Sequence, residues 1–520
     1  MKYPSFVGRP GLLLLMTVLL GMAACSKSDL AEDSSSGSGG SSASTTSGSV
    51  SIDSAYTTGS AEGSSETGSD EDDLVENSFS LSATVTIAFG SAVTVSNPLD
   101  GKGVTITKDG NNVVVNASVS GVAYKISGKT TDGSLKIYSD KKFELILDGV
   151  SITSTDRPAI NIQSKKTAFV ISSDNAENTL GDAAAYSAIP DTEDAKAALF
   201  SEGQLVFSGG GSLTVKGNYK HGICSDDYIR IRSGNITVTS TVKDAIHVND
   251  HFILDDGTLN LTSADDGIQV DAGYVIINNG TLTVNSTGKA ITADYDDEDP
   301  TATPYLVING GSVNITSADE GIESKGDLSI NGGDIEVKSS DDGINAGVNI
   351  YINGGRVYSY ATANDAIDAN GLLTVTGGLI VAIGSREPEA SFDCDARTFK
   401  ITGGMMVGVA GATSGPTASV CTVHSLVMGS ARSGQLIHIQ DEDGNEVMTF
   451  ETPESFSTLI YASSKLKTGK SYKVYTGGSV SSGTDFRGLY LGGTYSGGTS
   501  SASFTTTNMV TQIGGSISRG

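Results

Sequence analysis

The chain has 520 residues, of which 60 are acidic and 33 are basic, and its formal net charge at pH 7 is −27. This charge disfavours nucleic acid and an anionic membrane surface as partners, because both would repel an acidic protein. Four cysteines are too few for a disulfide framework in so long a chain. We expect either free buried thiols or one bridge between Cys394 and Cys421.

Residues 1–24 have the features of an export signal. Lys2 and Arg9 accompany a short apolar run at residues 12–20, which is too short to span a bilayer. Small residues then lead to Cys25. The pattern resembles a bacterial lipoprotein signal peptide, in which Cys25 becomes the acylated first residue. The alternative is an ordinary cleaved signal peptide. We expect an exported protein on the outer membrane or cell surface, whose only membrane contact is the lipid anchor.

Residues 25–77 consist mainly of serine, glycine, threonine and acidic residues, with few aliphatic side chains to bury. Such a composition cannot offset the entropy lost on ordering, so it predicts a flexible linker.

Residues 78–430 carry an internal repeat of 22–23 residues. A small residue followed by isoleucine recurs at this spacing, except for one step of 31 residues that contains a polar, acidic insertion at 294–304, and between these pairs the apolar residues alternate with a period of two. The pairs are Gly222-Ile223, Ala245-Ile246, Gly267-Ile268, Ala290-Ile291, Gly321-Ile322, Gly343-Ile344 and Ala366-Ile367. Alternation between Gly/Asn turns indicates three short strands per coil. Stacked coils with right-handed connections give an all-β fold, a right-handed parallel β-helix.

Two further features complete the predicted fold. Asparagine and aspartate recur at one bend of each coil, which predicts a side-chain ladder formed by Asp255, Asn278, Asn309, Asn331 and Asn353. After residue 430 the repeat ends, and apolar segments at 436–439, 447–450, 458–461 and 472–475 predict a small antiparallel β appendage over residues 431–520. This appendage would cover the last coil and its unpaired edge, and we expect a monomer.

Acidic residues occupy the same phase of successive coils, just before the small–Ile pair or a few positions after it. The predicted metal ligands are Asp244, Asp265, Asp266, Asp271, Asp294, Asp319, Glu320, Asp341, Asp342 and Asp365. Carboxylates stacked about 4.8 Å apart repel one another unless a cation neutralises them. An oxygen-only ligand set favours calcium over zinc. The competing interpretation is that these residues only cap turns and solvate one face.

The segments 263–268, 317–322 and 339–344 read SADDGI, SADEGI and SSDDGI, and Asn-Gly-Gly turns alternate with them. With the GNYKHGI segment at 217–223, they resemble a family of secreted bacterial carbohydrate-binding domain proteins over residues 130–510. The resemblance implies a right-handed parallel β-helix similar to that of calcium-dependent pectate lyases. It also implies that the protein binds plant cell-wall polysaccharides such as polygalacturonate (pectin) and cellulose. Gly288-Lys289 and Asn364 interrupt the acidic pattern, which puts calcium at those two coils in doubt.

Three functions fit these features. The first is calcium-mediated capture of an acidic polysaccharide, with sugar contacts predicted at Tyr274, Tyr295, Glu323, Asn345 and Asp368. The absence of tryptophan leaves tyrosine for sugar stacking, and Tyr358 and Tyr360 are further candidates. The second is a polysaccharide lyase, for which Lys289, Lys325 or Lys243 would be the base. The third is an adhesin or structural spacer.

Overall fold

The computed structural model describes residues 46–69, 73–187, 189–190, 192–295 and 302–518. The predicted signal peptide and Cys25 lie outside the described residues. The described chain is almost entirely β-structure, and α1 (Val75–Ser78) is a single turn of helix. No helix within these residues is both long enough and apolar enough to cross a membrane.

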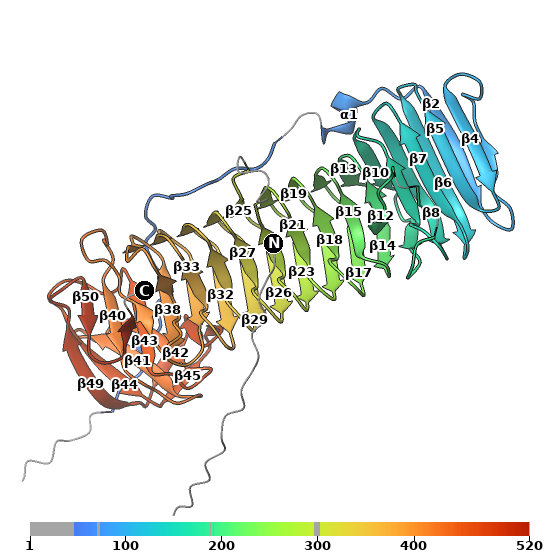
Figure 1. The fold of residues 1–520 in the computed structure, drawn as a ribbon. Helices are drawn as coiled ribbons and strands as arrows, with labels where there is room; N and C mark the ends of the chain where they lie inside the picture. Colours follow the sequence, from blue (N-terminus) through green and yellow to red (C-terminus); the bar gives the residue numbers. More distant parts are fainter. Residues whose placement is uncertain (1–45, 70–72, 188, 191, 296–301, 519–520) are drawn as a thin grey trace, which may run out of the picture. The chain divides into compact units, whose positions relative to one another are not determined.

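The predicted parallel β-helix is confirmed, with three strands in each coil that pair with their equivalents in the next coil (Figure 1). The first strands form sheet 1: β5 (Asn112–Ala117), β7 (Ser134–Ser139), β9 (Ile160–Gln163), β12 (Ala197–Ser201), β15 (His221–Ser225), β18 (Ile246–Val248), β21 (Ile268–Val270), β24 (Ile291–Ala293), β27 (Ile322–Ser324), β30 (Ile344–Ala346), β33 (Ile367–Ala369) and β36 (Asp393–Cys394).

The second strands form sheet 2: β10 (Ala168–Ser172), β13 (Leu205–Ser208), β16 (Ile229–Ile231), β19 (His251–Leu254), β22 (Tyr274–Ile277), β25 (Tyr305–Ile308), β28 (Asp327–Ile330), β31 (Ile350–Ile352), β34 (Leu373–Val375) and β37 (Phe399–Ile401). The third strands form sheet 3: β11 (Glu177–Gly181), β14 (Ser212–Gly217), β17 (Asn235–Ser240), β20 (Thr258–Ser263), β23 (Thr281–Ser286), β26 (Ser312–Ser317), β29 (Asp334–Ser339), β32 (Arg356–Ala361), β35 (Leu379–Ile383) and β38 (Met405–Ala410).

The repeated isoleucine points into the space that the three sheets enclose. Ile246, Ile268, Ile291, Ile322, Ile344 and Ile367 are fully buried and pair in register across sheet 1. Burial of each such side chain contributes about 1.5–3 kcal/mol. The residue before the isoleucine is glycine or alanine, and at Gly321 even a Cβ would not fit, because it would lie 2.2 Å from a methyl group of Val337. The sequence marker of the repeat is therefore a packing requirement.

The predicted amide ladder is confirmed at the bend between sheets 2 and 3. Each side-chain NH2 donates to the side-chain oxygen of the preceding coil: Asn278 to Asp255 (2.9 Å), Asn309 to Asn278 (2.9 Å), Asn331 to Asn309 (2.9 Å) and Asn353 to Asn331 (2.8 Å). The column fixes the register of coils whose backbone alone would accept a shifted alignment.

The second N–H of each ladder amide binds a chain segment that precedes the β-helix. This N-terminal strap (residues 59–69) accepts these bonds through its backbone carbonyls: Thr67 from Asn278 (2.9 Å), Glu66 from Asn309 (2.8 Å), Ser64 from Asn331 (2.9 Å) and Glu62 from Asn353 (2.7 Å). The Glu62 carboxylate also pairs with Lys400 at 2.5 Å. Part of the region predicted as a flexible linker thus lies along the ladder, because its backbone satisfies donors that the coils leave open.

The first coils are built differently from the repeat. β2 (Ala83–Phe89) pairs antiparallel with β3 (Thr94–Ser96) and parallel with β6 (Val122–Thr130), and β4 (Val104–Asp109) forms a hairpin with β5. The long strand β8 (Phe143–Thr153) pairs with β10 over its first half and with β11 over its second half. A bend at Gly149, where φ is 71°, therefore divides sheets 2 and 3.

The predicted antiparallel appendage is confirmed at the other end. Its main sheet contains β46 (Thr484–Phe486), β47 (Leu489–Leu491), β42 (Glu446–Glu451), β41 (Leu436–Asp441), β44 (Ser471–Thr476) and β49 (Thr499–Thr505), in that order. The segment predicted at 458–461 is β43 (Thr458–Ser463), which pairs antiparallel with β38 and so covers the edge of sheet 3. Before the strap, β1 (Val50–Ser51) pairs with β48 (Thr494–Ser496).

Three cysteines, Cys224, Cys394 and Cys421, are free and buried, so the bridge between Cys394 and Cys421 is not formed.

Replacement of one ladder amide tests the role of this column. We expect Asn331→Ala to lower the free energy of unfolding by about 1–3 kcal/mol, because it leaves polar groups of the ladder and the strap unpaired. Urea unfolding followed by circular dichroism measures the change. Asn285→Ala removes an exposed asparagine of β23 and should change stability by less than about 0.5 kcal/mol. Equal effects of the two substitutions would contradict a stabilising ladder.

Candidate functional site

Sheet 1 places the predicted outward residues in one column. Backbone register aligns the position after the isoleucine in successive coils. This sheet 1 column contains Cys224, His247, Gln269, Thr292, Glu323, Asn345, Asp368 and Asp393. Asp393 was missed in the sequence because its coil lacks the small–Ile marker.

The aspartates directly before the small–Ile pair have a structural task. One carboxylate oxygen of each accepts the backbone N–H of the equivalent residue in the next coil. The bonds are Asp244 from Asp266 (3.1 Å), Asp266 from Lys289 (2.7 Å), Asp342 from Asp365 (3.0 Å) and Asp365 from Ala390 (2.5 Å). These bonds join successive coils, and they leave the second oxygen of each carboxylate for other partners.

Imidazoles surround the first of these aspartates. Asp244 Oδ2 lies 3.1 Å from His221 Nδ1 and 3.0 Å from His247 Nδ1, and His247 Nε2 lies 3.1 Å from Asp271 Oδ2. Burial lowers the pKa of His247, but the two carboxylates outweigh it and raise that pKa to about 9. Although burial opposes it, the adjacent imidazoles hold the pKa of Asp244 well below its usual range. The coils around Asp244 thus neutralise carboxylates with histidine.

Lysines neutralise the middle of the column. Glu323, which is only 2% exposed, pairs with both Lys289 and Lys325, and Lys289 also lies 3.6 Å from Glu320. Lys243 pairs with Asp265 at 2.6 Å. Burial lowers the pKa of Lys289, but the neighbouring carboxylates raise it above its ordinary value. A lysine with a raised pKa stays protonated, which disfavours it as the general base of a lyase.

Toward the C-terminal coils the acidic residues have no such partner. Asp365, Asp368 and Asp393 each place a carboxylate oxygen within 4.8 Å of the others. Asn345 donates to Asp342 (2.9 Å) and to Asp368 (3.0 Å). In the described part of the chain, no lysine, arginine or histidine nitrogen forms an ion pair with these four carboxylates. We call Asp342, Asn345, Asp365, Asp368 and Asp393 the acidic cluster.

Burial and mutual repulsion raise the pKa values of Asp342, Asp365 and Asp368 in the acidic cluster. Burial, together with Asp342 and Asp393, raises the pKa of Asp365 to about 8 and that of Asp368 to about 7. Burial raises the pKa of Asp342 to about 6. Protons or a cation must therefore compensate these charges near neutral pH. Asp319, Glu320 and Asp341 form a second oxygen cluster, in which burial and Asp319 raise the pKa of Glu320 to about 7.

The predicted tyrosines lie elsewhere. Tyr274 begins β22 in sheet 2, where its ring stacks between His251 (4.5 Å) and Tyr305 (4.7 Å). Tyr295 is half exposed, and its backbone N–H donates to the Asp294 carboxylate. Tyr295 directly precedes the undescribed stretch 296–301.

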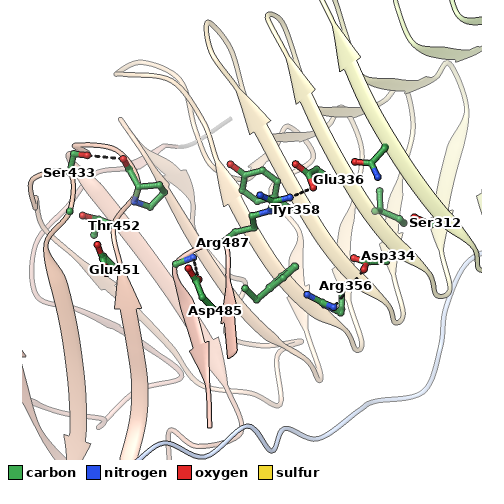
Figure 2. Close-up of a pocket in the computed structure, with 16 residues that line it drawn as sticks. Ser312, Asp334, Glu336, Arg356, Tyr358, Ser433, Glu451, Thr452, Asp485 and Arg487 are labelled. Atoms are coloured by element: carbon green, nitrogen blue, oxygen red, sulfur yellow. Dashed lines mark hydrogen bonds and ion pairs between the residues drawn. The ribbon is translucent and has the colours of Figure 1, made fainter. Parts of the chain in front are cut away.

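A groove of about 760 Å³ between sheet 3 and the appendage was not predicted (Figure 2). Arg487 forms an ion pair with Glu336 and lies over the Tyr358 ring, 5.0 Å from its centre. Arg356 lies 4.7 Å from the centre of the Phe486 ring. Tyr358 was the only residue of the groove that the sequence singled out. The opposite wall of the groove comes from residues 433–434, 451–453 and 485–488. No repeat connects these residues to sheet 3, so the sequence could not place them there.

The ion pairs around Glu323 make a testable prediction about stability. We expect Lys289→Met combined with Lys325→Met to lower the free energy of unfolding by about 3 kcal/mol, because a buried carboxylate loses both partners. Adding Glu323→Gln should recover most of the loss, as measured by urea unfolding. Lys338→Met, which breaks a more exposed pair with Glu336, should cost less than about 1 kcal/mol. A double variant as stable as this control would refute the neutralising role.

Comparison with known proteins identifies the family. The family model "Carbohydrate-binding domain-containing protein" matches residues 100–358 and 274–388, which together span more than half of the chain. A curated protein of that name from Acetivibrio thermocellus is 35% identical over 115 residues, covering 21% of this chain and 40% of the relative. The solved structure of a polysaccharide lyase-like protein from C. thermocellum, a gadolinium derivative, is similar with 23% identity and a TM-score of 0.38, covering 57% of this chain and 99% of that one. The chain belongs to the family of carbohydrate-binding domain-containing proteins.

Proposed function

We propose that this protein is a cell-surface lipoprotein that captures acidic polysaccharide, such as polygalacturonate, through calcium held at the acidic cluster. The observation that carries the proposal is the group of four carboxylates in the acidic cluster, which lack an ion-pair partner among the described residues. Family membership supports a carbohydrate as the ligand. The proposal goes further in naming the ion, the acidic class of glycan and the surface location.

The donor atoms of the acidic cluster fit calcium. Asp365, Asp368 and Asp393 offer carboxylate oxygens close to one another, and calcium takes six to eight oxygen ligands from carboxylates, amides, backbone and water. The residues of the cluster that we expect to hold it are Asp342, Asp365, Asp368 and Asp393. When bound, calcium would supply positive charge between protein carboxylates and the carboxylates of a uronate polymer. This removes the difficulty that a protein of charge −27 would otherwise repel an acidic glycan.

The protein's own side chains fix the geometry of this site. Asp365 Oδ1 accepts the Ala390 N–H and Asp342 Oδ1 accepts the Asp365 N–H, so the coils themselves orient two of the carboxylates. The Asn345 amide bridges Asp342 and Asp368. A preorganised set of ligands loses little entropy when an ion binds. Of the residues predicted to contact sugar, Asn345 and Asp368 lie in the acidic cluster, and Glu323 lies in the same column.

The proposed anchor is Cys25, which lies outside the described residues. The described chain starts beside the appendage, where Ser47 N–H donates to the Gly498 carbonyl (2.9 Å). The strap then carries the chain along the ladder toward the first coils. Cys25 precedes this end of the described chain in the sequence.

Calcium and glycan binding can be tested together. We expect Asp368→Asn to weaken calcium binding at least tenfold and to abolish calcium-dependent retention on immobilised polygalacturonate, because it removes a charged oxygen ligand. Isothermal titration calorimetry and retention with and without chelator measure the two effects. Asp174→Asn, which changes the net charge equally at an exposed turn, should leave both unchanged.

The same assay separates the acidic cluster from the groove and from the alternative functions. Glycan retention that survives Asp368→Asn and is lost in Arg356→Ala would move the binding site to the groove. A steady rise of unsaturated-uronide absorbance on polygalacturonate would establish a lyase instead. Calcium that raises the melting temperature without retention on any glycan would indicate a spacer or adhesin.

The raised pKa values predict how stability depends on pH when calcium is absent. Asp342, Asp365 and Asp368 have folded pKa values of about 6, 8 and 7, above the unfolded value of about 3.9. The folded state therefore binds more protons, and its stability falls as pH rises from about 4 to about 8. We expect the melting temperature in chelator to decrease over this range, and calcium to remove the decrease. A melting temperature that is flat or rises over the same range in chelator would contradict the shifts.

A further inference from the structure

The region around Asp244 differs chemically from the acidic cluster. His221, Asp244 and His247 come from two successive coils, and each offers a ligand atom within 4.8 Å of those of the other two. The two imidazole rings stack with their centres 4.3 Å apart and 24° between their planes. Both Nδ1 atoms approach the same carboxylate oxygen, at 3.1 and 3.0 Å. These separations match those between ligands that share one metal ion at about 2.0–2.2 Å.

Hydrogen bonding within the described residues does not explain why the Nδ1 atom of His221 is buried. Its side chain is 9% exposed, and its Nδ1 atom makes no hydrogen bond of acceptable geometry within the described residues, although Asp244 Oδ2 is 3.1 Å away. A buried polar atom without a partner costs about 1–3 kcal/mol. The Nδ1 atom thus lies close to the carboxylate oxygen without pointing directly at it, and an ion placed to one side of the line between the two atoms would satisfy both.

The groups behind these three ligands are also those of a metal site. His247 Nε2 lies 3.1 Å from Asp271 Oδ2, and Gln269 holds the other oxygen of Asp271 at 3.3 Å. Asp244 Oδ1 accepts the Asp266 backbone N–H. A metal-binding histidine usually donates its other ring N–H to a carboxylate, which fixes its tautomer and orientation. Asp271 thus orients the His247 ring, and the Asp266 backbone N–H orients the Asp244 carboxylate.

We propose that His221, Asp244 and His247 form a binding site for a divalent transition metal ion, with zinc as the best match. Two imidazole nitrogens and one carboxylate oxygen suit zinc and its first-row neighbours, whereas calcium takes oxygen ligands only. Three protein ligands leave a coordination position for water or a ligand from solution. The site is independent of the proposed calcium function, since it shares no residue with the acidic cluster. It replaces the expectation that Asp244 and Asp271 bind calcium.

Cobalt titration of the full chain, produced without a histidine tag and stripped of metal, tests this site. At about pH 8, we expect one equivalent of Co²⁺ to bind. The bound Co²⁺ should show the visible d–d absorption that is typical of nitrogen ligands. Zn²⁺ should displace it, whereas excess Ca²⁺ should not. His221→Ala and His247→Ala should each weaken binding at least 100-fold, and Asp271→Asn should weaken it about 10–100-fold. Asp368→Asn should leave it unchanged.

Circular dichroism establishes that each variant is folded. If the alanine variants do not fold, X-ray absorption on the zinc-loaded natural chain decides the question, because two imidazole ligands give a distinct scattering pattern. Cobalt affinity that is unchanged in both folded histidine variants, or a zinc environment of oxygen only, would overturn the proposal. Loss of cobalt binding in Asp368→Asn would place the metal at the acidic cluster and would overturn it as well.

Discussion

The register of parallel coils is the constraint on which the rest of the structure depends. Each side chain has its equivalent in the next coil about 4.8 Å away, so the same residue type repeats as a column. This spacing favours isoleucine, whose buried column forms the core, and it favours asparagine, whose amide is both donor and acceptor for its neighbours. It disfavours carboxylates, because like charges at this distance repel. A register that packs Ile322 against Ile344 therefore also aligns Glu323 with the next polar residue.

The three solutions to carboxylate repulsion along sheet 1 explain why one repeated motif yields chemically different sites. Histidines accompany Asp244, and lysines accompany Glu323. Around Asp368, backbone and amide donors are present without a cationic side chain among the described residues. The small–Ile pair is constant, whereas the residue before it and the residue after the isoleucine vary from coil to coil, as His221, Lys289 and Glu323 show. The variable positions therefore determine the chemistry of each coil, while the constant pair maintains the stacking.

The features that could be predicted from the sequence are those that repeat. The small–Ile pairs mark the first strands, so Ile268 begins β21 and Ile344 begins β30 as expected, and the spacing of Asn309 and Asn331 was enough to predict the ladder. The acidic column was predictable for the same reason. Two features were not, because they join segments without a common period. The groove pairs Tyr358 with Arg487, and Asp393 enters the column from a coil of different length. His221 holds the position of Asp244 one coil earlier, but the ligands expected at that position were carboxylates.

The N-terminal strap shows why composition misled the prediction of a flexible linker. A segment of serine, glycine and acidic residues has few side chains to bury, but here its backbone forms the contacts. Every ladder amide has two N–H groups, and the preceding coil uses only one of them. The strap carbonyls accept the other, and the absence of large side chains is what permits this approach. A Cβ on Gly63, whose φ is 79°, would lie 2.5 Å from the Tyr351 ring. Glycine in this segment therefore serves close packing against the coils, and the contacts depend on donors that only the folded ladder presents in a row.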